Sequence, residues 1–158
     1  MANYSLSNAW DQARRRLALL EQYLDPITDR RLSSLGLSKG WHCLEVGGGG
    51  GSVARWLSDQ VGADGRVVGT DIDPRFLEEI REPNFEAWKH DIAVDDLPTG
   101  EFDLVHTRWV LQHLEDPEAA IRRMIAALRP GGWLLVEEMD FFPIHTASSQ
   151  LYIALITC

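Results

Sequence analysis

The chain has 158 residues, of which 45% are hydrophobic and 25% are charged, an ordinary balance for a soluble globular protein. A chain of this length is most simply one domain, which would bury roughly 70% of the surface of its unfolded form. Its 24 acidic and 15 basic residues give a net charge of −9, which argues against general nucleic-acid binding because no broad cationic field is available to neutralise phosphates.

Cysteine usage and hydropathy indicate the compartment. The two cysteines, Cys43 and Cys158, are too few for a disulfide framework, so both are expected as reduced thiols. No apolar run has the length of a signal-peptide core or of a membrane-spanning helix. These features predict a cytoplasmic protein that does not cross a membrane.

The first forty residues predict a pair of helices. Apolar residues from Trp10 to Leu24 recur at steps of three and four, which is typical of an amphipathic helix. A second helix is predicted with Asp25 as its cap, Pro26 in its first turn and Gly36 at its end.

From residue 42 onward, short apolar strands alternate with amphipathic helices. Strands are predicted at 42–46, 66–71, 84–91 and 102–107, and a fifth strand, WLLVEEM, follows the tight reversal RPGG at 129–132. Helices are predicted over 53–61, after the cap Asp73 and after the cap Asp116. This alternation predicts an α/β fold with a parallel sheet covered by helices on both faces.

Five consecutive glycines at 47–51 join the first strand to its helix. Strand, glycine turn, helix and a second strand that ends in Asp71 make the first βαβ unit of a nucleotide-binding fold. In such a unit, backbone N–H groups and the positive end of the helix face the ligand. A flexible linker would not explain why both flanks of the turn are regular elements.

The spacing of the glycines bears on which ligand is bound. The dinucleotide pattern G-x-G-x-x-G is not met, because its sixth position is Ser52 or Val53, depending on the register. The turn instead satisfies E-x-G-x-G-x-G, with the residues Glu45, Gly47, Gly49 and Gly51. A carboxylate at this place would repel a pyrophosphate, and it suits a nucleoside that carries a positively charged amino-acid tail.

These residues resemble those of the class I S-adenosylmethionine-dependent methyltransferases, over about residues 40 to 140. Four signatures of that family occur in order: LEVGGGGGS, VVGTDIDP, WKHDI, and the segment that runs from FDLVHT to LLVEE. The resemblance implies a Rossmann-like three-layer sandwich with a mainly parallel sheet. It also implies S-adenosylmethionine as the cofactor and a methyltransferase activity.

The resemblance further implies roles for single residues. The glycine turn would pass under the methionine part of the cofactor, Glu45 would act at its amino group, and Thr107 and Arg108 would meet the methionine end. At the nucleoside, the implied contacts are Asp71 with the ribose hydroxyls, Ile72 with the adenine face, Asp91 with the adenine amino group and the backbone of Ile92 with the ring. No metal is expected.

Methyl transfer from a sulfonium is an in-line displacement, so the protein must mainly align a small-molecule acceptor and exclude water. A general base is needed only if the acceptor loses a proton as it attacks. His106 and His113 are the nearest candidates and both are weak. A structural role is favoured for His113, because apolar residues flank it.

The resemblance divides the chain into three segments. Residues 1–38 are expected to form a helical lid, in which Tyr4 and Trp10 could touch the cofactor, although packing is favoured for Trp10. Residues 39–140 are expected to form the cofactor-binding domain, and 141–158 the start of a substrate-covering insertion. The last strands of the family are missing, so the chain resembles a truncated member.

The truncation predicts how the chain assembles. The fifth strand would have a bare edge, and the final segment LYIALIT reads as the start of an apolar helix without charge. Because such surfaces pair with other chains, a homodimer is expected. Two other functions stay open: a non-catalytic cofactor-binding subunit, and an NAD-dependent oxidoreductase, against which the missing glycine and Glu45 both count.

Overall fold

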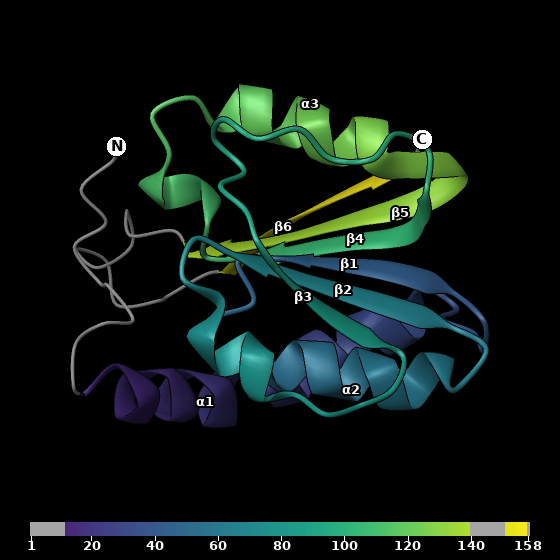
Figure 1. Ribbon diagram of the computed structural model, residues 1–158. Coiled ribbons are helices and arrows are strands. Elements are labelled where there is room, and N and C mark those ends of the chain that lie inside the picture. The colour runs from purple at the N-terminus through teal and green to yellow at the C-terminus, as the bar shows by residue number, and fades with distance from the viewer. Residues whose placement is uncertain (1–11, 140–150, 158) are drawn as a thin grey trace.

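The computed structural model describes residues 12–139 and the backbone of 151–157. Its centre is a six-stranded sheet in the order β3-β2-β1-β4-β5-β6 (Figure 1). The strands are β1 (His42–Val46), β2 (Arg66–Asp71), β3 (Phe85–Lys89), β4 (Phe102–Arg108), β5 (Leu128–Met139) and β6 (Leu151–Thr157). Strands β1 to β5 are parallel, and β6 runs antiparallel to β5. The predicted α/β, Rossmann-like fold is confirmed.

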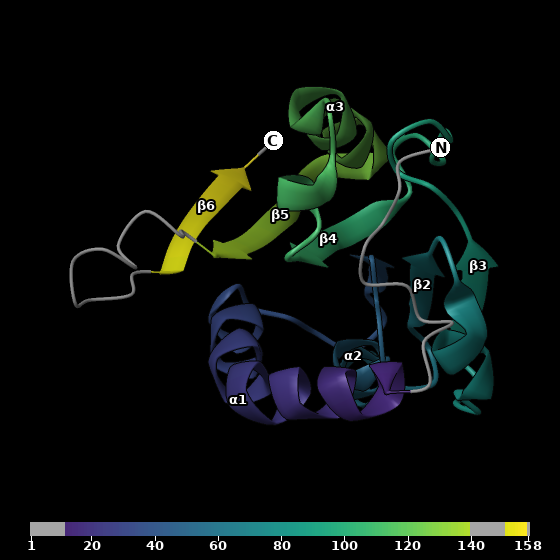
Figure 2. The same ribbon diagram turned by 90° about the vertical axis from the view of Figure 1, so that its left-hand side faces the viewer.

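Helices cover both faces of the sheet, and Figures 1 and 2 show α1 and α2 on one side and α3 on the other. The helices are α1 (Ala13–Ser34), α2 (Ser52–Val61) and α3 (Pro117–Ala127), with 3₁₀ helices η1 (Pro74–Glu79) and η2 (Leu111–His113). Along each central strand, successive residues pack alternately into one of two hydrophobic cores, one on each face of the sheet. Leu44 packs in the core under α3, and its neighbour Cys43 packs under α1 and α2. Cys43 is a buried free thiol.

The predicted helix pair is wrong for the described residues, because α1 is one helix of 22 residues with Pro26 inside it. Proline removes one backbone hydrogen bond from a helix, which usually breaks it. Here Leu24, Thr28 and Leu32 are buried at four-residue intervals across that point. Tertiary burial on both sides of the proline holds the helix continuous. Trp10 and Tyr4 lie outside the described residues.

The predicted reversal RPGG lies inside β5. Leu128 pairs with Phe102 and Trp133 pairs with Leu104, so the residues between them form a bulge opposite Asp103. Asp103 forms an ion pair with Arg129 at this bulge. A bulge of this kind turns the strand direction while keeping the ladder on both sides.

The predicted bare edge of β5 and the predicted final helix are both wrong. The segment LYIALIT forms β6, and all seven of its residues pair with β5, from Met139–Leu151 to Trp133–Thr157. The outer edge of β5 therefore forms its backbone hydrogen bonds with β6. One strand beyond the fifth is therefore present.

Two strands and one helix cap agree with the sequence, and one predicted cap does not. Strands β1 and β2 have the predicted bounds, and Asp116 caps α3 by accepting a hydrogen bond from the backbone N–H of Ala119 at 2.9 Å. The predicted cap Asp73 makes no capping hydrogen bond, and it pairs instead with Arg75. None of the described helices has the length and hydropathy needed to cross a lipid bilayer.

Candidate functional site

The glycine turn lies between β1 and α2, at the carboxyl end of the sheet. Gly47, Gly49 and Gly51 have φ angles of 72°, 54° and 86°, in the left-handed region that favours glycine. The N–H groups of Gly47 and Gly48 donate to the carbonyl of Thr70 at 2.8 and 2.9 Å. The alternating glycines of the motif are therefore required by the backbone, and the end of β2 anchors the turn.

Neighbouring elements also pack closely on this turn. A Cβ atom at Gly47 would overlap the side chain of Val110, which follows β4. A Cβ atom at Gly50 would overlap the carboxylate of Glu21 in α1. The turn thus has no room for a side chain at Gly47 toward the β4 loop, whereas a side chain at Gly50 would require the end of the flexible Glu21 side chain to move.

Asp71, the predicted ribose ligand, lies beside the turn. Its carboxylate accepts hydrogen bonds from the N–H of Gly49 at 3.1 Å and from that of Asp73 at 2.9 Å. Burial raises the pKa of Asp71 from its usual value, and the backbone hydrogen bonds oppose that change. Each carboxylate oxygen still has a lone pair for a ligand hydroxyl. The next residue, Ile72, is apolar and 44% exposed, which leaves it free to pack on a flat ring.

The loop after β3 adjoins this end of β2. The N–H of His90 donates to the carbonyl of Asp71 at 3.0 Å, so the predicted ribose and adenine ligands lie on neighbouring strands. Asp91 is half-buried, and its Oδ1 accepts from the N–H of Ala93 at 3.0 Å. Ile92 is buried in the core under α3.

Thr107 and Arg108 end β4 but point to different partners. Thr107 is buried, and its hydroxyl donates to the carbonyl of Val46 at 3.0 Å, which ties the ends of β1 and β4 together. The Arg108 side chain reaches α1, where it bonds Asp25 and Thr28, each at 2.9 Å. Arg108 therefore anchors α1 with its side chain.

Glu45 and His106 occupy one buried row across β1 and β4. His106 is 0% exposed, and its Nδ1 lies 2.5 Å from Glu45 Oε2 while its Nε2 lies 3.0 Å from Glu137 Oε2. With both ring nitrogens taken and no solvent contact, His106 is badly placed to accept a proton from a substrate. His113 lies exposed in η2, which does not fit the packing role favoured for it.

Two further residues near the site were missed from the sequence. Trp109 follows β4 with a φ of 59°, which is unusual for a residue with a side chain, and its N–H donates to the carbonyl of Glu137 at 2.8 Å. Glu138 accepts from the N–H groups of Val110 and Leu111 at 3.0 and 2.8 Å. The available signal was the pair of acids in the apolar strand WLLVEEM, because buried charges need partners.

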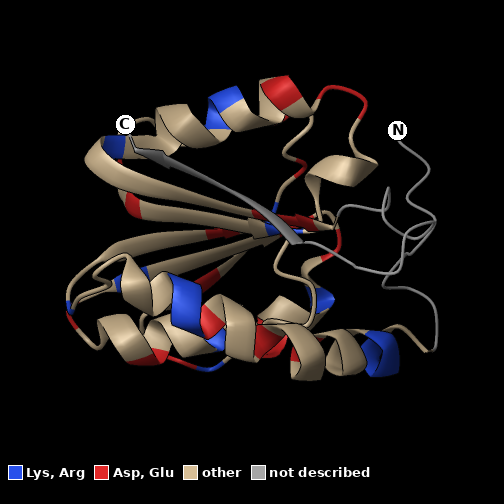
Figure 3. Cartoon of the chain, turned by 180° about the vertical axis from the view of Figure 1, so that it is seen from behind, with Lys and Arg blue, Asp and Glu red and all other residues tan. Residues whose placement is uncertain are grey.

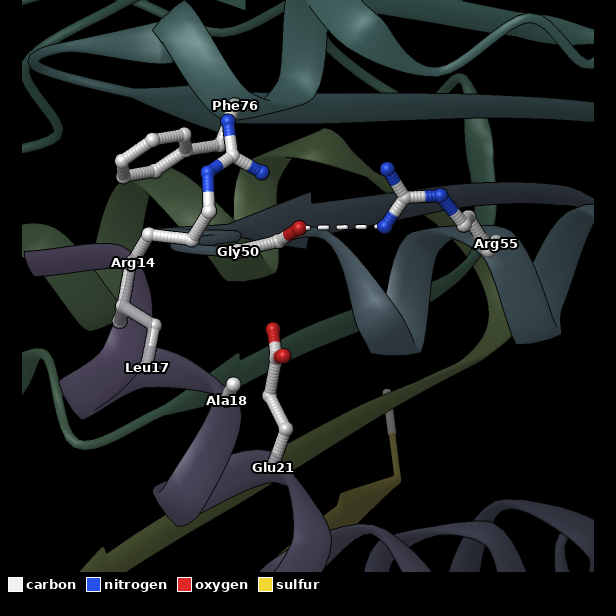
Figure 4. Close-up of a pocket in the computed structure, with 7 residues that line it drawn as sticks. All are labelled: Arg14, Leu17, Ala18, Glu21, Gly50, Arg55 and Phe76. Atoms are coloured by element: carbon white, nitrogen blue, oxygen red, sulfur yellow. Dashed lines mark hydrogen bonds between the residues drawn. The ribbon is translucent and has the colours of Figure 1, made fainter.

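A pocket of about 270 Å³ borders the turn on the side of α1 (Figure 4). Figure 4 shows the Arg14 guanidinium over the Phe76 ring, and the distance from its carbon to the ring centroid is 4.5 Å. The lining residues are Arg14, Leu17, Ala18, Glu21, Gly50, Arg55 and Phe76. Neither Asp71 nor Asp91 lines it, so this pocket is separate from the predicted nucleoside contacts.

Comparison with known proteins identifies the family. A family model described as a methyltransferase domain matches residues 10–152. The chain belongs to this methyltransferase family. It is 32% identical over 129 residues to the ubiquinone/menaquinone biosynthesis C-methyltransferase UbiE of Pseudoalteromonas translucida, a match that covers 77% of this chain and 51% of the relative.

Two other similarities agree with this family. A ubiquinone biosynthesis O-methyltransferase of Bordetella avium is 30% identical over 115 residues, which cover 68% of this chain and 46% of the relative. A crystal structure of an S-adenosylmethionine-dependent methyltransferase from Aquifex aeolicus has the same fold, with a TM-score of 0.68 at 21% identity, and the match covers 80% and 73% of the two chains. The methyltransferase chain spans about half the length of the curated relatives it matches.

The cofactor of the family, S-adenosylmethionine, fits the residues at the turn. The turn is built from glycines that a side chain would disrupt, and an acid with free lone pairs stands beside it. Glu45, two residues before the turn, has one oxygen bonded to His106. Its other oxygen has no hydrogen-bond partner among the described residues, which suits a ligand with a cationic group.

Proposed function

We propose that this methyltransferase binds S-adenosylmethionine at the glycine turn and transfers its methyl group to a small-molecule acceptor by in-line displacement. The observation that carries the proposal is the contact between Asp71 and the N–H of Gly49, which joins the ribose acid to the turn. Side by side, these elements offer a turn without side chains, a carboxylate and an exposed apolar residue to one nucleoside.

Each group has a distinct task in this proposal. Bound S-adenosylmethionine supplies a methyl group already activated on a positively charged sulfur. Asp71 accepts from the ribose hydroxyls, Ile72 packs on the adenine, and Asp91 accepts from the adenine amino group. Glu45 balances the charge of the amino group, and the loop that begins at Trp109 borders the methyl end of the site.

The two named relatives support a small-molecule acceptor. Both are named for ubiquinone biosynthesis, one as a C-methyltransferase and the other as an O-methyltransferase. We propose an acceptor of the same class, a small ring compound with a carbon or oxygen nucleophile. An assay with candidate acceptors identifies the atom that receives the methyl group.

Calorimetry with S-adenosylmethionine, its demethylated product S-adenosylhomocysteine and NAD tests the cofactor. Only the first two are expected to bind. Asp71→Ala should weaken binding by about 1.5 to 3 kcal/mol, because a charged acceptor of two hydroxyls is lost. Asp71→Asn, which keeps the shape and one acceptor, should lose less. Binding of NAD, or unchanged affinity in Asp71→Ala, would contradict the proposal.

Methyl transfer to a panel of hydroquinones and phenols tests the activity. Transfer is expected with at least one member of the panel. Tight binding of the cofactor without transfer to any of them would favour the alternative of a non-catalytic cofactor-binding subunit. The same panel should then be repeated with a chain extended to the length of the relatives.

We also propose that the protein is cytoplasmic and forms a homodimer. Among the described residues, the two edge strands of the sheet are β3 and β6, and the sequence of β6, LYIALIT, carries no charge. An uncharged edge strand favours pairing with a second copy. Light scattering at micromolar concentration should give the mass of a dimer, and a stable monomer would refute this part.

A further inference from the structure

Three ionisable side chains form a buried row across the sheet beneath α1. Glu45 of β1, His106 of β4 and Glu137 of β5 are 3%, 0% and 1% exposed. The imidazole lies between the two carboxylates, at 2.5 Å from Glu45 and 3.0 Å from Glu137. In Figure 3, acidic and basic segments meet where the central strands end.

With both carboxylates ionised, this geometry favours the charged form of His106. A neutral imidazole has one N–H, so one of the two carboxylates would face a lone pair. An imidazolium donates to both. Burial by itself lowers the pKa of His106, but the charge of Glu45 and the hydrogen bond with Glu137 outweigh it and raise the pKa to about 9.

Hydrogen bonds extend this buried row into α1. Thr28 donates to Glu137 at 2.6 Å and accepts from Arg108 at 2.9 Å, and Arg31 bonds the second oxygen of Glu137 at 2.6 Å. The charged groups that face the row from α1 and β4 are Asp25, Asp29, Arg31 and Arg108. Glu137 is therefore held by donors on both of its oxygens.

Glu45 is held on one side only. His106 fixes Oε2, whereas Oε1 has no hydrogen-bond partner among the described residues. The side chain lies against the turn, because a Cβ atom at Gly48 would be 3.4 Å from Glu45 Cγ. One oxygen is thus immobilised by a buried cation, and the other is left for a donor that approaches from the turn.

We infer that His106 is a positioning residue, whose imidazolium holds Glu45 so that Oε1 receives the ammonium group of the cofactor's amino-acid tail. This inference rests on the proposed function. It assigns His106 to the cofactor, through Glu45, and takes it away from proton transfer with the acceptor. It also links the docking of α1, through Glu137, to the strength with which the tail is bound.

The test compares two ligands that differ in the tail. S-adenosylhomocysteine carries the ammonium, whereas 5′-methylthioadenosine has the same nucleoside and lacks the amino acid. His106→Gln should weaken S-adenosylhomocysteine by about tenfold or more, the size of one charge-assisted hydrogen bond, and change methylthioadenosine by less than about twofold. A merely structural role would weaken both ligands alike, and that result would overturn the inference.

Further variants separate the causes. Glu45→Gln should match His106→Gln, and the double variant should lose no more than either single one, because both remove the same contact. His42→Gln, the same substitution at the opposite end of β1, should leave both affinities unchanged. Additive losses in the double variant would refute a shared contact.

A measurement on the unaltered protein covers the case in which His106→Gln does not fold. The ¹⁵N shifts of the His106 ring at pH 7.5 should show both nitrogens protonated, and they should change when S-adenosylhomocysteine binds but much less with methylthioadenosine. A neutral ring would overturn the inference. If wild-type protein bound neither ligand, the proposed function itself would fail, which is a different outcome.

Discussion

Raising the pH from about 6.5 to 9 should destabilise this methyltransferase. The cause is His106, whose pKa is about 9 in the folded protein and 6.5 when unperturbed. At about 1.4 kcal/mol for each pH unit, this difference corresponds to about 3 kcal/mol of stability. A contribution of that size is a large part of the total stability of a small domain.

Stability falls as the pH rises, because the folded protein binds the His106 proton more tightly than the unfolded chain does. The contribution is fully present below about pH 6.5 and is lost as the pH rises through about 9, so the free energy of unfolding should fall by about 1.4 kcal/mol per unit between them. Burial raises the pKa of Glu137, but the bond with His106 outweighs it and lowers that pKa to about 2. The same ion pair is therefore lost in acid as the pH falls from about 4.5 through 2.

Urea denaturation from pH 5.5 to 9.5 at constant ionic strength, followed by tryptophan fluorescence, measures this profile. His106→Gln should be less stable than wild type by about 3 kcal/mol at pH 6. The difference between the two proteins should close as the pH approaches 9. Parallel profiles for the two proteins, or a wild-type profile that is flat between pH 6.5 and 9, would refute the reasoning.

Three other substitutions have defined outcomes. Gly47→Ala should abolish cofactor binding measured by calorimetry, because φ is +72° and the side chain of Val110 occupies the space. Gly36→Ala is the control for backbone strain alone, because φ there is +82° and the surroundings are open. Thr28→Val should lower the free energy of unfolding by about 1 to 3 kcal/mol, because Glu137 loses a buried donor; equal urea midpoints would contradict this. Asp116→Ala should cost about 1 kcal/mol by removing the cap of α3, also measured in urea, and no loss would show that the cap is dispensable.

Features set by a few neighbouring residues could be predicted from the sequence. The bounds of β1 follow from a short apolar run and those of β2 from a β-branched run, and the cap at Asp116 follows from its place before a proline and an apolar stripe. The turn and Asp71 were predicted to lie together because consecutive parallel strands end at the same edge. The contact between Gly49 and Asp71 has this origin.

Features set by distant residues could not be predicted in the same way. Pro26 predicts the end of a helix. Nothing near it in the sequence indicates that Glu137, on a distant strand, bonds Thr28 and holds the following turn in place. The final segment reads as a helix because an uncharged apolar run gives no period, and its pairing with β5 depends on the tertiary fold. Glu45 was predicted to meet a ligand, but its buried partner lies 61 residues away.

The anchoring of α1 has a consequence for how the chain folds. Thr28 and Arg31 of α1 contact Glu137, which lies 109 and 106 residues further along the chain. Asp25 of α1 contacts Arg108, which lies 83 residues further along. During synthesis α1 emerges before these strands, and its polar anchors emerge only with the fourth and fifth strands. Contacts between such remote segments carry a large loop-closure entropy and form late. Helix α1 is therefore among the last elements to be fixed in place, and the buried row beneath it closes only when the central sheet is complete.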